Sequence, residues 1–82
     1  MLKWYYTKRF LKKMIKLFEE TNVDYEITKG KHTILIFAKD KNKTEWKEFG
    51  LYWKKQTRQF IKNWKEFGFI FQYEIEHFIK EV

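Results

Sequence analysis

Two strand-like segments separated by a short turn are the feature that most constrains the fold of this chain. In residues 23–28 (VDYEIT), apolar and polar residues alternate, which is the pattern of a strand with one buried face. Residues 32–38 (HTILIFA) are mostly β-branched and apolar, which is typical of a central strand covered on both faces or nearly so. The basic turn at residues 29–31 (KGK) joins them, and we expect Gly30 to adopt a positive φ there.

Amphipathic helical patterns flank this predicted hairpin. Residues 5–20 place apolar side chains on one side and Lys and Arg on the other, which predicts a helix with Thr7 as a candidate N-cap and Asn22 as the C-cap. Residues 53–67 repeat the basic amphipathic pattern and predict a second helix that stops at Gly68. The apolar positions that follow suit a short third helix, although the first of them also suit a strand.

The segment at residues 44–53 (TEWKEFGLYW) is predicted to be a third strand. Phe49, Leu51 and Trp53 would share one face, and Gly50 in the middle indicates a bulge or a close backbone approach. A helical assignment stays open, because the pentapeptide WKEFG occurs here and again near residue 64, and both copies would then be helix ends stopped by Gly. Their flanking sequences differ, so we interpret the repeat as a coincidence.

The predicted order is a helix, three strands, a helix and a short helix. Short turns between consecutive strands favour antiparallel pairing. We therefore predict a single α+β domain over residues 1–82, an αβββα(α) sandwich in which a three-stranded antiparallel meander carries two amphipathic helices on one face.

The charge balance indicates a polyanionic partner. The formal net charge is +7, which favours RNA, DNA or an acidic protein surface, although a Lys-rich solvated surface would have the same composition. The predicted nucleic-acid contacts are Lys12, Lys13, Lys54, Lys55, Arg58 and Lys62 on the helices, with Lys29, Gly30 and Lys31 at the turn. Trp46 and Tyr52 are predicted to stack on bases, to cover a core edge or to meet a protein partner.

Several function classes are not expected. The chain has no Cys and only two His, so disulfides, thiolate metal sites and structural zinc are not predicted, and we expect no metal or other cofactor. No apolar run approaches the roughly 20 residues of a membrane span, so no membrane association is expected. The lack of Cys suits the reducing cytoplasm, which is the expected location.

The element order and the residues GKH at 30–32 resemble known RNA-binding proteins. An α-β-β-β-α order in a small basic chain is similar to the double-stranded-RNA-binding domain, and more closely resembles the HicA-type mRNA interferase toxins. In that family a Gly-Ser-His turn opens the second strand, and Gly30 and His32 match it while Lys31 replaces Ser. Arg58 falls near the family's Arg in the second helix. The family's Gly-Thr before that helix, its Pro and its second His are absent here.

The resemblance implies a metal-independent endoribonuclease that is neutralised by a cognate antitoxin. His32 would be the catalytic acid–base residue, while Lys29, Lys31 and Arg58 would position the phosphate. Cleavage by the 2′-hydroxyl also needs a second acid–base group, and the sequence does not place His77 near the first. A solvated surface histidine is the alternative for His32.

Three functions therefore stay open on the sequence. The first is a small RNA-binding domain, with a HicA-like ribonuclease toxin as its most specific version. The second is a non-enzymatic phage-type inhibitor that binds a host defence nuclease or its nucleic-acid-binding surface. The third is a DNA-binding module that places one basic helix in the major groove.

Overall fold

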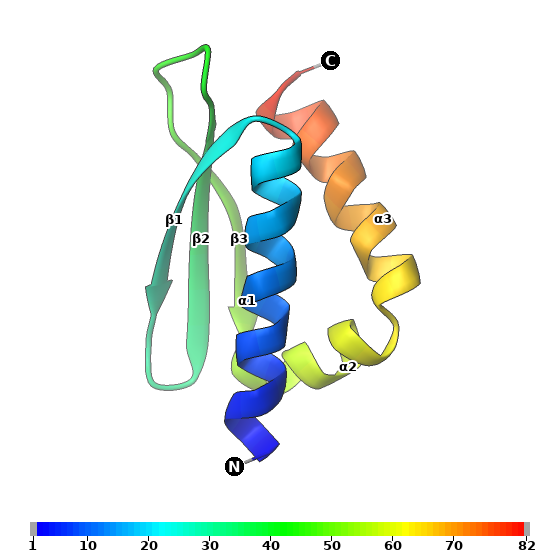
Figure 1. The fold of residues 1–82 in the computed structure, drawn as a ribbon. Coiled ribbons are helices and arrows are strands. Elements are labelled where there is room, and N and C mark those ends of the chain that lie inside the picture. The colour runs from blue at the N-terminus through cyan, green and yellow to red at the C-terminus, as the bar shows by residue number, and fades with distance from the viewer. Residues whose placement is uncertain (1, 82) are drawn as a thin grey trace.

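The computed structural model describes residues 2–81 and shows a three-stranded sheet with the helices on one side (Figure 1). The strand order is β1-β2-β3, and both neighbouring pairs are antiparallel. The predicted α+β architecture is therefore confirmed. In chain order the elements are α1 (Leu2–Glu20), β1 (Val23–Lys29), β2 (Thr33–Asp40), β3 (Lys47–Trp53), the 3₁₀ turn η1 (Lys54–Gln56), α2 (Thr57–Lys62), α3 (Trp64–Glu74) and the π-helical turn η2 (Ile75–Ile79).

The central strand β2 is covered on one face only. Buried and half-buried residues alternate along its whole length. Ile34 and Ile36 are fully buried against the helices, whereas Leu35 and Phe37 point to the other face and are only partly buried. The sequence predicted a strand covered on both faces or nearly so. The helices all pack on one side of the sheet, and the outward residues of β2 are partly but not fully buried.

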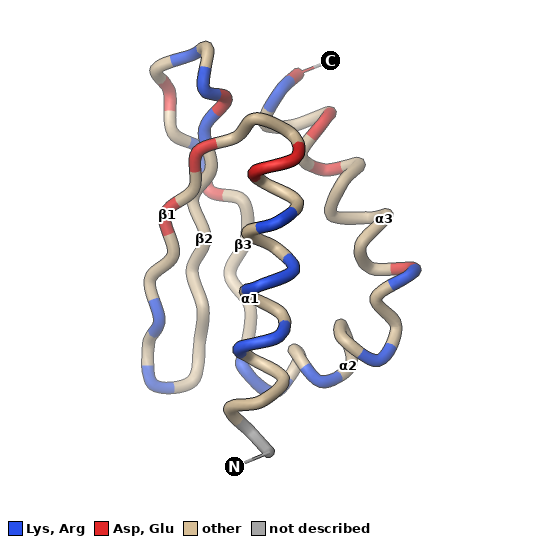
Figure 2. Tube along the Cα trace, viewed as in Figure 1, with Lys and Arg blue, Asp and Glu red and all other residues tan. Residues whose placement is uncertain are grey.

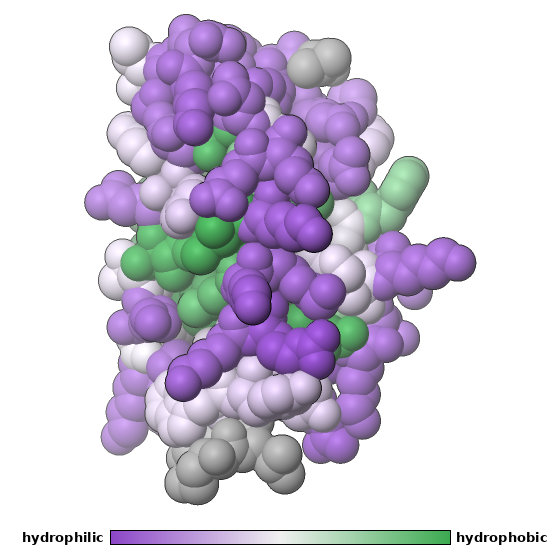
Figure 3. Space-filling view, in the orientation of Figure 1, coloured by the Kyte–Doolittle hydropathy of each residue, from purple (hydrophilic) through white to green (hydrophobic). Residues whose placement is uncertain are grey.

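Aromatic rings fill the core between the sheet and the helices. Phe10 of α1 lies at its centre, with its ring centroid 5.2 Å from that of Phe60 in α2 and 5.8 Å from that of Phe71 in α3. Large rings bury much apolar area per residue, which suits a chain this short. The surface seen in Figure 3 is mostly hydrophilic, with hydrophobic side chains showing between β1 and α1.

A β-bulge in β3 decides which of its side chains enter the core. Ile36 pairs with Gly50 and Phe37 pairs with Glu48, so Phe49 is the extra residue on β3 and the predicted bulge is confirmed. Phe49 therefore packs against the core, and the strand after it presents Tyr52 inward, while Leu51 and Trp53 face outward. The prediction that Phe49, Leu51 and Trp53 share a face is wrong for this reason.

The predicted second helix is divided in the structure. Trp53 still belongs to β3, and the chain then passes through η1 and α2 to a break at Asn63, where φ is −120° and ψ is 39°. Gly68 is not a helix stop but a buried residue inside α3. A Cβ on Gly68 would come within 3.0 Å of the Trp64 indole, so the glycine allows that ring to pack closely.

The two ends of α1 differ from each other in how well they were predicted. Asn22 has a φ of 60°, which confirms the left-handed C-cap. Thr7 is not the N-cap, because the helix already begins at Leu2. Instead Thr7 is buried, and its Oγ1 lies 3.3 Å from Oγ1 of Thr57, which links α1 to α2.

Candidate nucleic-acid interface

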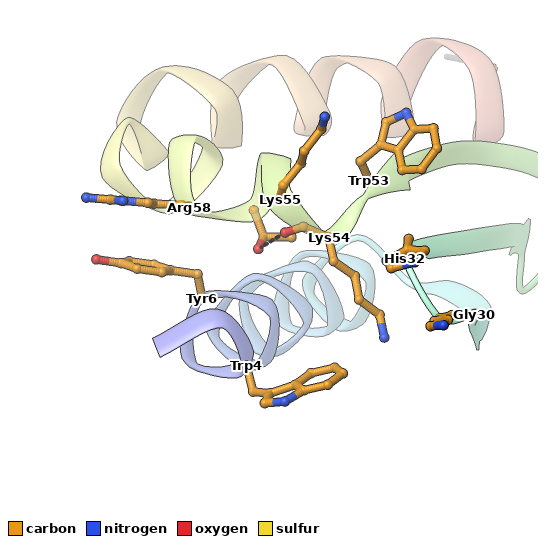
Figure 4. A pocket seen from close by; sticks show the side chains of 10 residues that line it. Trp4, Tyr6, Gly30, His32, Trp53, Lys54, Lys55 and Arg58 are labelled. Atoms are coloured by element: carbon orange, nitrogen blue, oxygen red, sulfur yellow. Dashed lines mark hydrogen bonds between the residues drawn. The ribbon is translucent and has the colours of Figure 1, made fainter. Parts of the chain in front are cut away.

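A groove of about 1000 Å³ lies at the end of the molecule that carries the β1–β2 turn (Figures 1 and 4). Its walls come from three distant segments: the start of α1, the β1–β2 turn, and the end of β3 with η1 and α2. The fold thereby brings together six of the residues predicted from the sequence. They are Gly30, Lys31 and His32 from the turn and Lys54, Lys55 and Arg58 from η1 and α2.

Backbone hydrogen bonds fix the turn against η1. The Gly30 N–H donates to the Thr33 carbonyl at 2.8 Å, and the Lys54 N–H donates to the His32 carbonyl at 2.8 Å. The expected positive φ at Gly30 is wrong, since none of the described glycines has one. The constraint at Gly30 is instead a close approach, because an added Cβ would lie 3.0 Å from the Thr33 hydroxyl.

A buried threonine pair supports the part of the groove formed by η1. Thr57 is only 1% exposed, and its hydroxyl donates to the Lys54 carbonyl at 2.6 Å. The same hydroxyl also contacts Thr7 of α1. Because one side chain joins η1 to α1, the wall that carries the groove lysines is held in a fixed position relative to the start of α1.

Each of three groove cations lies over an aromatic ring. Ammonium and guanidinium groups within about 6 Å of a ring centroid are attracted by the ring face. The three pairs come from different elements, so they also order the mouth of the groove. They are Lys54 on Trp4 at 4.4 Å, Lys55 on Trp53 at 5.8 Å and Arg58 on Tyr6 at 5.9 Å.

The positive charge of the groove is not compensated by acidic groups. Among the described residues that line it, none is Asp or Glu, and Figure 2 shows the acidic segments away from this end. The ion pairs within residues 2–81 involve other cations. They are Lys39 with Asp24, Lys80 with Asp40, and both Lys43 and Lys47 with Glu81.

Hydrogen bonds and neighbouring ammonium groups lower the pKa of two acidic groups at the opposite end. The backbone N–H of Asn42 and the ammonium of Lys80 lower the pKa of Asp40, and hydrogen bonds from Lys47 and Lys43 lower that of Glu81. Both carboxylates are therefore ionised at neutral pH and neutralise the lysines around them. The groove cations form no ion pair among the described residues, so the groove would attract anions.

Three groove aromatics were missed in the sequence analysis. Trp4, Tyr6 and Trp53 line the groove, but Tyr6 and Trp53 were assigned only to a helix or strand pattern, and Trp4 precedes the predicted helix at residues 5–20. The distribution of acidic residues along the chain would have pointed to them. No Asp or Glu occurs in residues 1–18, 27–39 or 49–65, and these are the segments that meet at the groove.

Some predicted nucleic-acid contacts lie outside the groove. Lys29 is exposed at the end of β1, and Lys12 is exposed on α1. Lys13 is half-buried, with its ammonium 5.6 Å from the centroid of the Trp64 ring. Lys62, at the end of α2, borders a second, smaller hollow. These side chains extend the basic surface but do not line the groove.

The two predicted stacking residues are separated by the fold. Trp46 is exposed just before β3, with its ring 5.9 Å from the Lys39 ammonium, at the end of the sheet away from the groove. Tyr52 packs in the core, with its ring centroid 5.7 Å from that of Phe10, and burial raises its pKa above the usual value. The structure therefore agrees with the core-edge alternative for Tyr52, because its ring packs against the core on the helix side of the sheet.

The groove holds one imidazole and no described carboxylate. His32 is exposed at its edge. His77 lies in η2, where its ring centroid is 4.1 Å from that of Tyr73, and η2 is at the far end of the sheet (Figure 1). The structure therefore does not bring a second histidine to His32. Within residues 2–81 there is also no cluster of acidic and histidine side chains able to hold a metal ion.

No helix in the described part of the chain is both long and apolar enough to cross a membrane. No protein-family model, curated protein or solved structure matches the chain.

Proposed function

We propose that the chain is a small RNA-binding domain whose groove holds a short single-stranded segment. The observation that carries the proposal is the set of three cation–aromatic pairs around a groove with no acidic lining residue. Proteins that bind single strands combine positive charge along the backbone with aromatic rings on which bases stack. Both kinds of group occur here in one place.

Phosphates would bind to Lys31, Lys54, Lys55 and Arg58. Arg58 can grip a phosphate with two N–H groups, whereas the lysines act as point charges. Because no described acidic group competes for these cations, they keep their charge for a ligand. Binding of a strand would release condensed counterions, so the affinity should fall as salt rises.

Bases would stack on Trp4 and Trp53, which lie on different walls of the groove. The two residues are 44% and 53% exposed, so both present apolar area to a ligand. Stacking on an exposed ring contributes about 1–3 kcal/mol per base and tolerates any base. We therefore expect weak sequence preference. We place the protein in the cytoplasm, where such strands occur and a chain without Cys needs no oxidising compartment.

His32 gives this proposal a narrower version, a HicA-like endoribonuclease. Its position at the groove edge would bring the imidazole near a bound 2′-hydroxyl, and Lys31 and Arg58 would hold the phosphate. General acid–base cleavage needs a second proton-transferring group besides His32. The groove contains no second imidazole, and none of its described lining residues is Asp or Glu. Binding without cleavage is therefore the function that the geometry favours.

Binding can be tested by fluorescence anisotropy with a labelled 12-nucleotide RNA at several salt concentrations. Four phosphate contacts predict a log–log salt slope of about −3 for a single strand. The double variant Lys54→Ala/Lys55→Ala should bring it to about −1.4, since each contact contributes about 0.7. Lys41→Ala/Lys43→Ala is the matched control, because these lysines lie in the β2–β3 loop, and it should leave the slope near −3.

Three further comparisons separate the alternatives. Trp4→Leu should weaken binding at every salt concentration without changing the slope, because it removes stacking and not charge. Unlabelled duplex RNA, single-stranded DNA and duplex DNA serve as competitors. A preference for duplex DNA would support the DNA-binding alternative. RNA that stays intact supports a binder, whereas cleavage lost in His32→Ala with binding retained would support the ribonuclease. A salt slope near zero would refute nucleic-acid binding.

A further inference from the structure

The sheet face that points away from the helices carries apolar side chains that the groove does not explain. Residues paired across strands share a face, so Leu35 of β2 lies beside Leu51 of β3. Phe37 of β2 lies between Glu26 of β1 and Glu48 of β3. Leu51 is 61% exposed, and Leu35 and Phe37 are partly buried. The centre of this face is therefore apolar, with Leu51 open to solvent and Leu35 and Phe37 partly covered.

The sequence of β2 fits a strand that is covered on both faces. Antiparallel strands with one solvated face normally alternate apolar and polar residues. In β2 the run Ile34–Phe37 is apolar on both sides, although the helices of this chain cover only one. The outward residues Leu35 and Phe37 would lose contact with water only if another molecule packed on them.

The charges around this face restrict what that molecule can be. Glu26 and Glu48 are exposed and form no ion pair among the described residues, so phosphates would be repelled. A second copy packed face to face about a twofold axis would bring these same carboxylates together, which is also unfavourable. Asp24 adds a third acidic group but is paired with Lys39 at 3.2 Å. The face therefore favours a partner that is apolar with basic flanks.

The spacing of the strands matches a helix in that role. Neighbouring strands lie about 4.8 Å apart, so the rows on β1 and β3 are separated by about 10 Å. A helix with its side chains is about 10–12 Å wide. A helix lying along β2 would place its apolar stripe over Leu35 and Phe37 and its flanks over Glu26 on β1 and Glu48 on β3.

We propose that the outer sheet face binds an amphipathic helix of a partner protein, with Lys or Arg on both flanks of its apolar stripe. The proposal does not rest on the proposed RNA binding, whose groove lies at one end of the molecule between α1, the β1–β2 turn and η1. The two sites meet at Trp53, which is on the outer face of β3 and also lines the groove.

The test uses two labelled synthetic helical peptides that share one leucine stripe and differ only in having lysine or glutamate on the flanks. The whole chain carries +7, so non-specific attraction would favour the glutamate peptide. The proposal predicts the opposite, about fivefold tighter binding of the lysine peptide, from two exposed charge pairs. The double variant Glu26→Lys/Glu48→Lys should reverse the preference, and its surface positions should leave folding intact.

Two matched variants locate the binding surface. Phe37→Ser should abolish binding of the lysine peptide, whereas Phe69→Ser should not, because Phe69 is exposed on α3 (74%) away from the sheet face. Equal binding of both peptides, binding of neither, or a preference unaffected by the charge reversal would each overturn the proposal. A dimer in sedimentation analysis that Phe37→Ser converts to a monomer would overturn it in favour of a second copy.

Discussion

Replacing Gly50 by Ala tests whether the bulge in β3 and the ring of Tyr52 determine the core. An added Cβ would lie 2.3 Å from the Tyr52 hydroxyl oxygen and 2.5 Å from its Cζ, far below ordinary contact distance. The Tyr52 ring has little room to move, since its centroid is 5.7 Å from that of Phe10 and 5.6 Å from that of Phe60. The substitution therefore forces a large ring into neighbours that are already packed.

The expected magnitude follows from two opposing contributions. Overpacking a filled core costs about 1–3 kcal/mol. The backbone at Gly50 has no positive φ, so Ala would fit it and return about 0.5–1 kcal/mol of unfolded-state entropy. We expect a net loss of about 1–2 kcal/mol in the free energy of unfolding. For a domain of this size the melting temperature should fall by about 5–15 °C.

Thermal and urea unfolding followed by circular dichroism would measure this loss. A double-mutant cycle with Tyr52→Leu supplies the control, because a smaller side chain leaves space for the added methyl group. In that background Gly50→Ala should be neutral or slightly stabilising. The explanation fails if Gly50→Ala is as stable as the wild type, or if it is equally destabilising in both backgrounds.

Three further predictions concern single contacts, each measurable by urea unfolding. Thr57→Val removes the hydroxyl that donates to the Lys54 carbonyl and should cost about 1–3 kcal/mol, whereas a value near zero would mean that the buried pair does not hold η1. Asn22→Ala should cost about 1 kcal/mol at a φ of 60° while Asn22→Gly should be near neutral, and equal effects would contradict the left-handed cap. The lowered pKa of Asp40 stabilises the fold above the unfolded value of about 4, and this contribution is lost as pH falls through the lower folded pKa. Asp40→Asn should therefore lose less stability than the wild type between pH 5 and pH 3, and parallel pH profiles would contradict this.

Local sequence predicted the elements that are amphipathic along their whole length. The alternation in residues 23–28 and the helical pattern in residues 5–20 became β1 and α1, because a regular apolar face needs only one surface to pack on. The cap at Asn22 was also predictable, since it depends on one residue type and its immediate neighbours.

The repeated pentapeptide WKEFG shows why the rest of the fold was harder to predict. Its first copy, near Phe49, runs into β3, and its second copy, at Phe67, begins α3. In both places the Phe side chain packs against the core, so the burial of one ring does not distinguish strand from helix. Pairing with β2 decides the first copy, and contacts between distant elements decide the second.

The groove was predicted only in part for a similar reason. Lys31, His32 and Arg58 stood out because of their residue types and the Gly30 turn. Trp4 and Tyr6 lie far from them in sequence, and their place in the site depends on how α1 packs beside η1. No local sequence pattern predicts that packing. The only sequence signal shared by the groove segments is that none of them contains Asp or Glu.

An NMR titration of the ¹⁵N-labelled protein with a short single-stranded RNA tests the central claim most directly. If the groove is the RNA site, the amide signals that shift will cluster in residues 4–6, 30–32 and 53–58, with the indole N–H signals of Trp4 and Trp53 among them. The indole signal of Trp46, at the other end of the sheet, should not move. Shifts centred on the outer sheet face or on α3, or no shifts at low salt, would contradict the account.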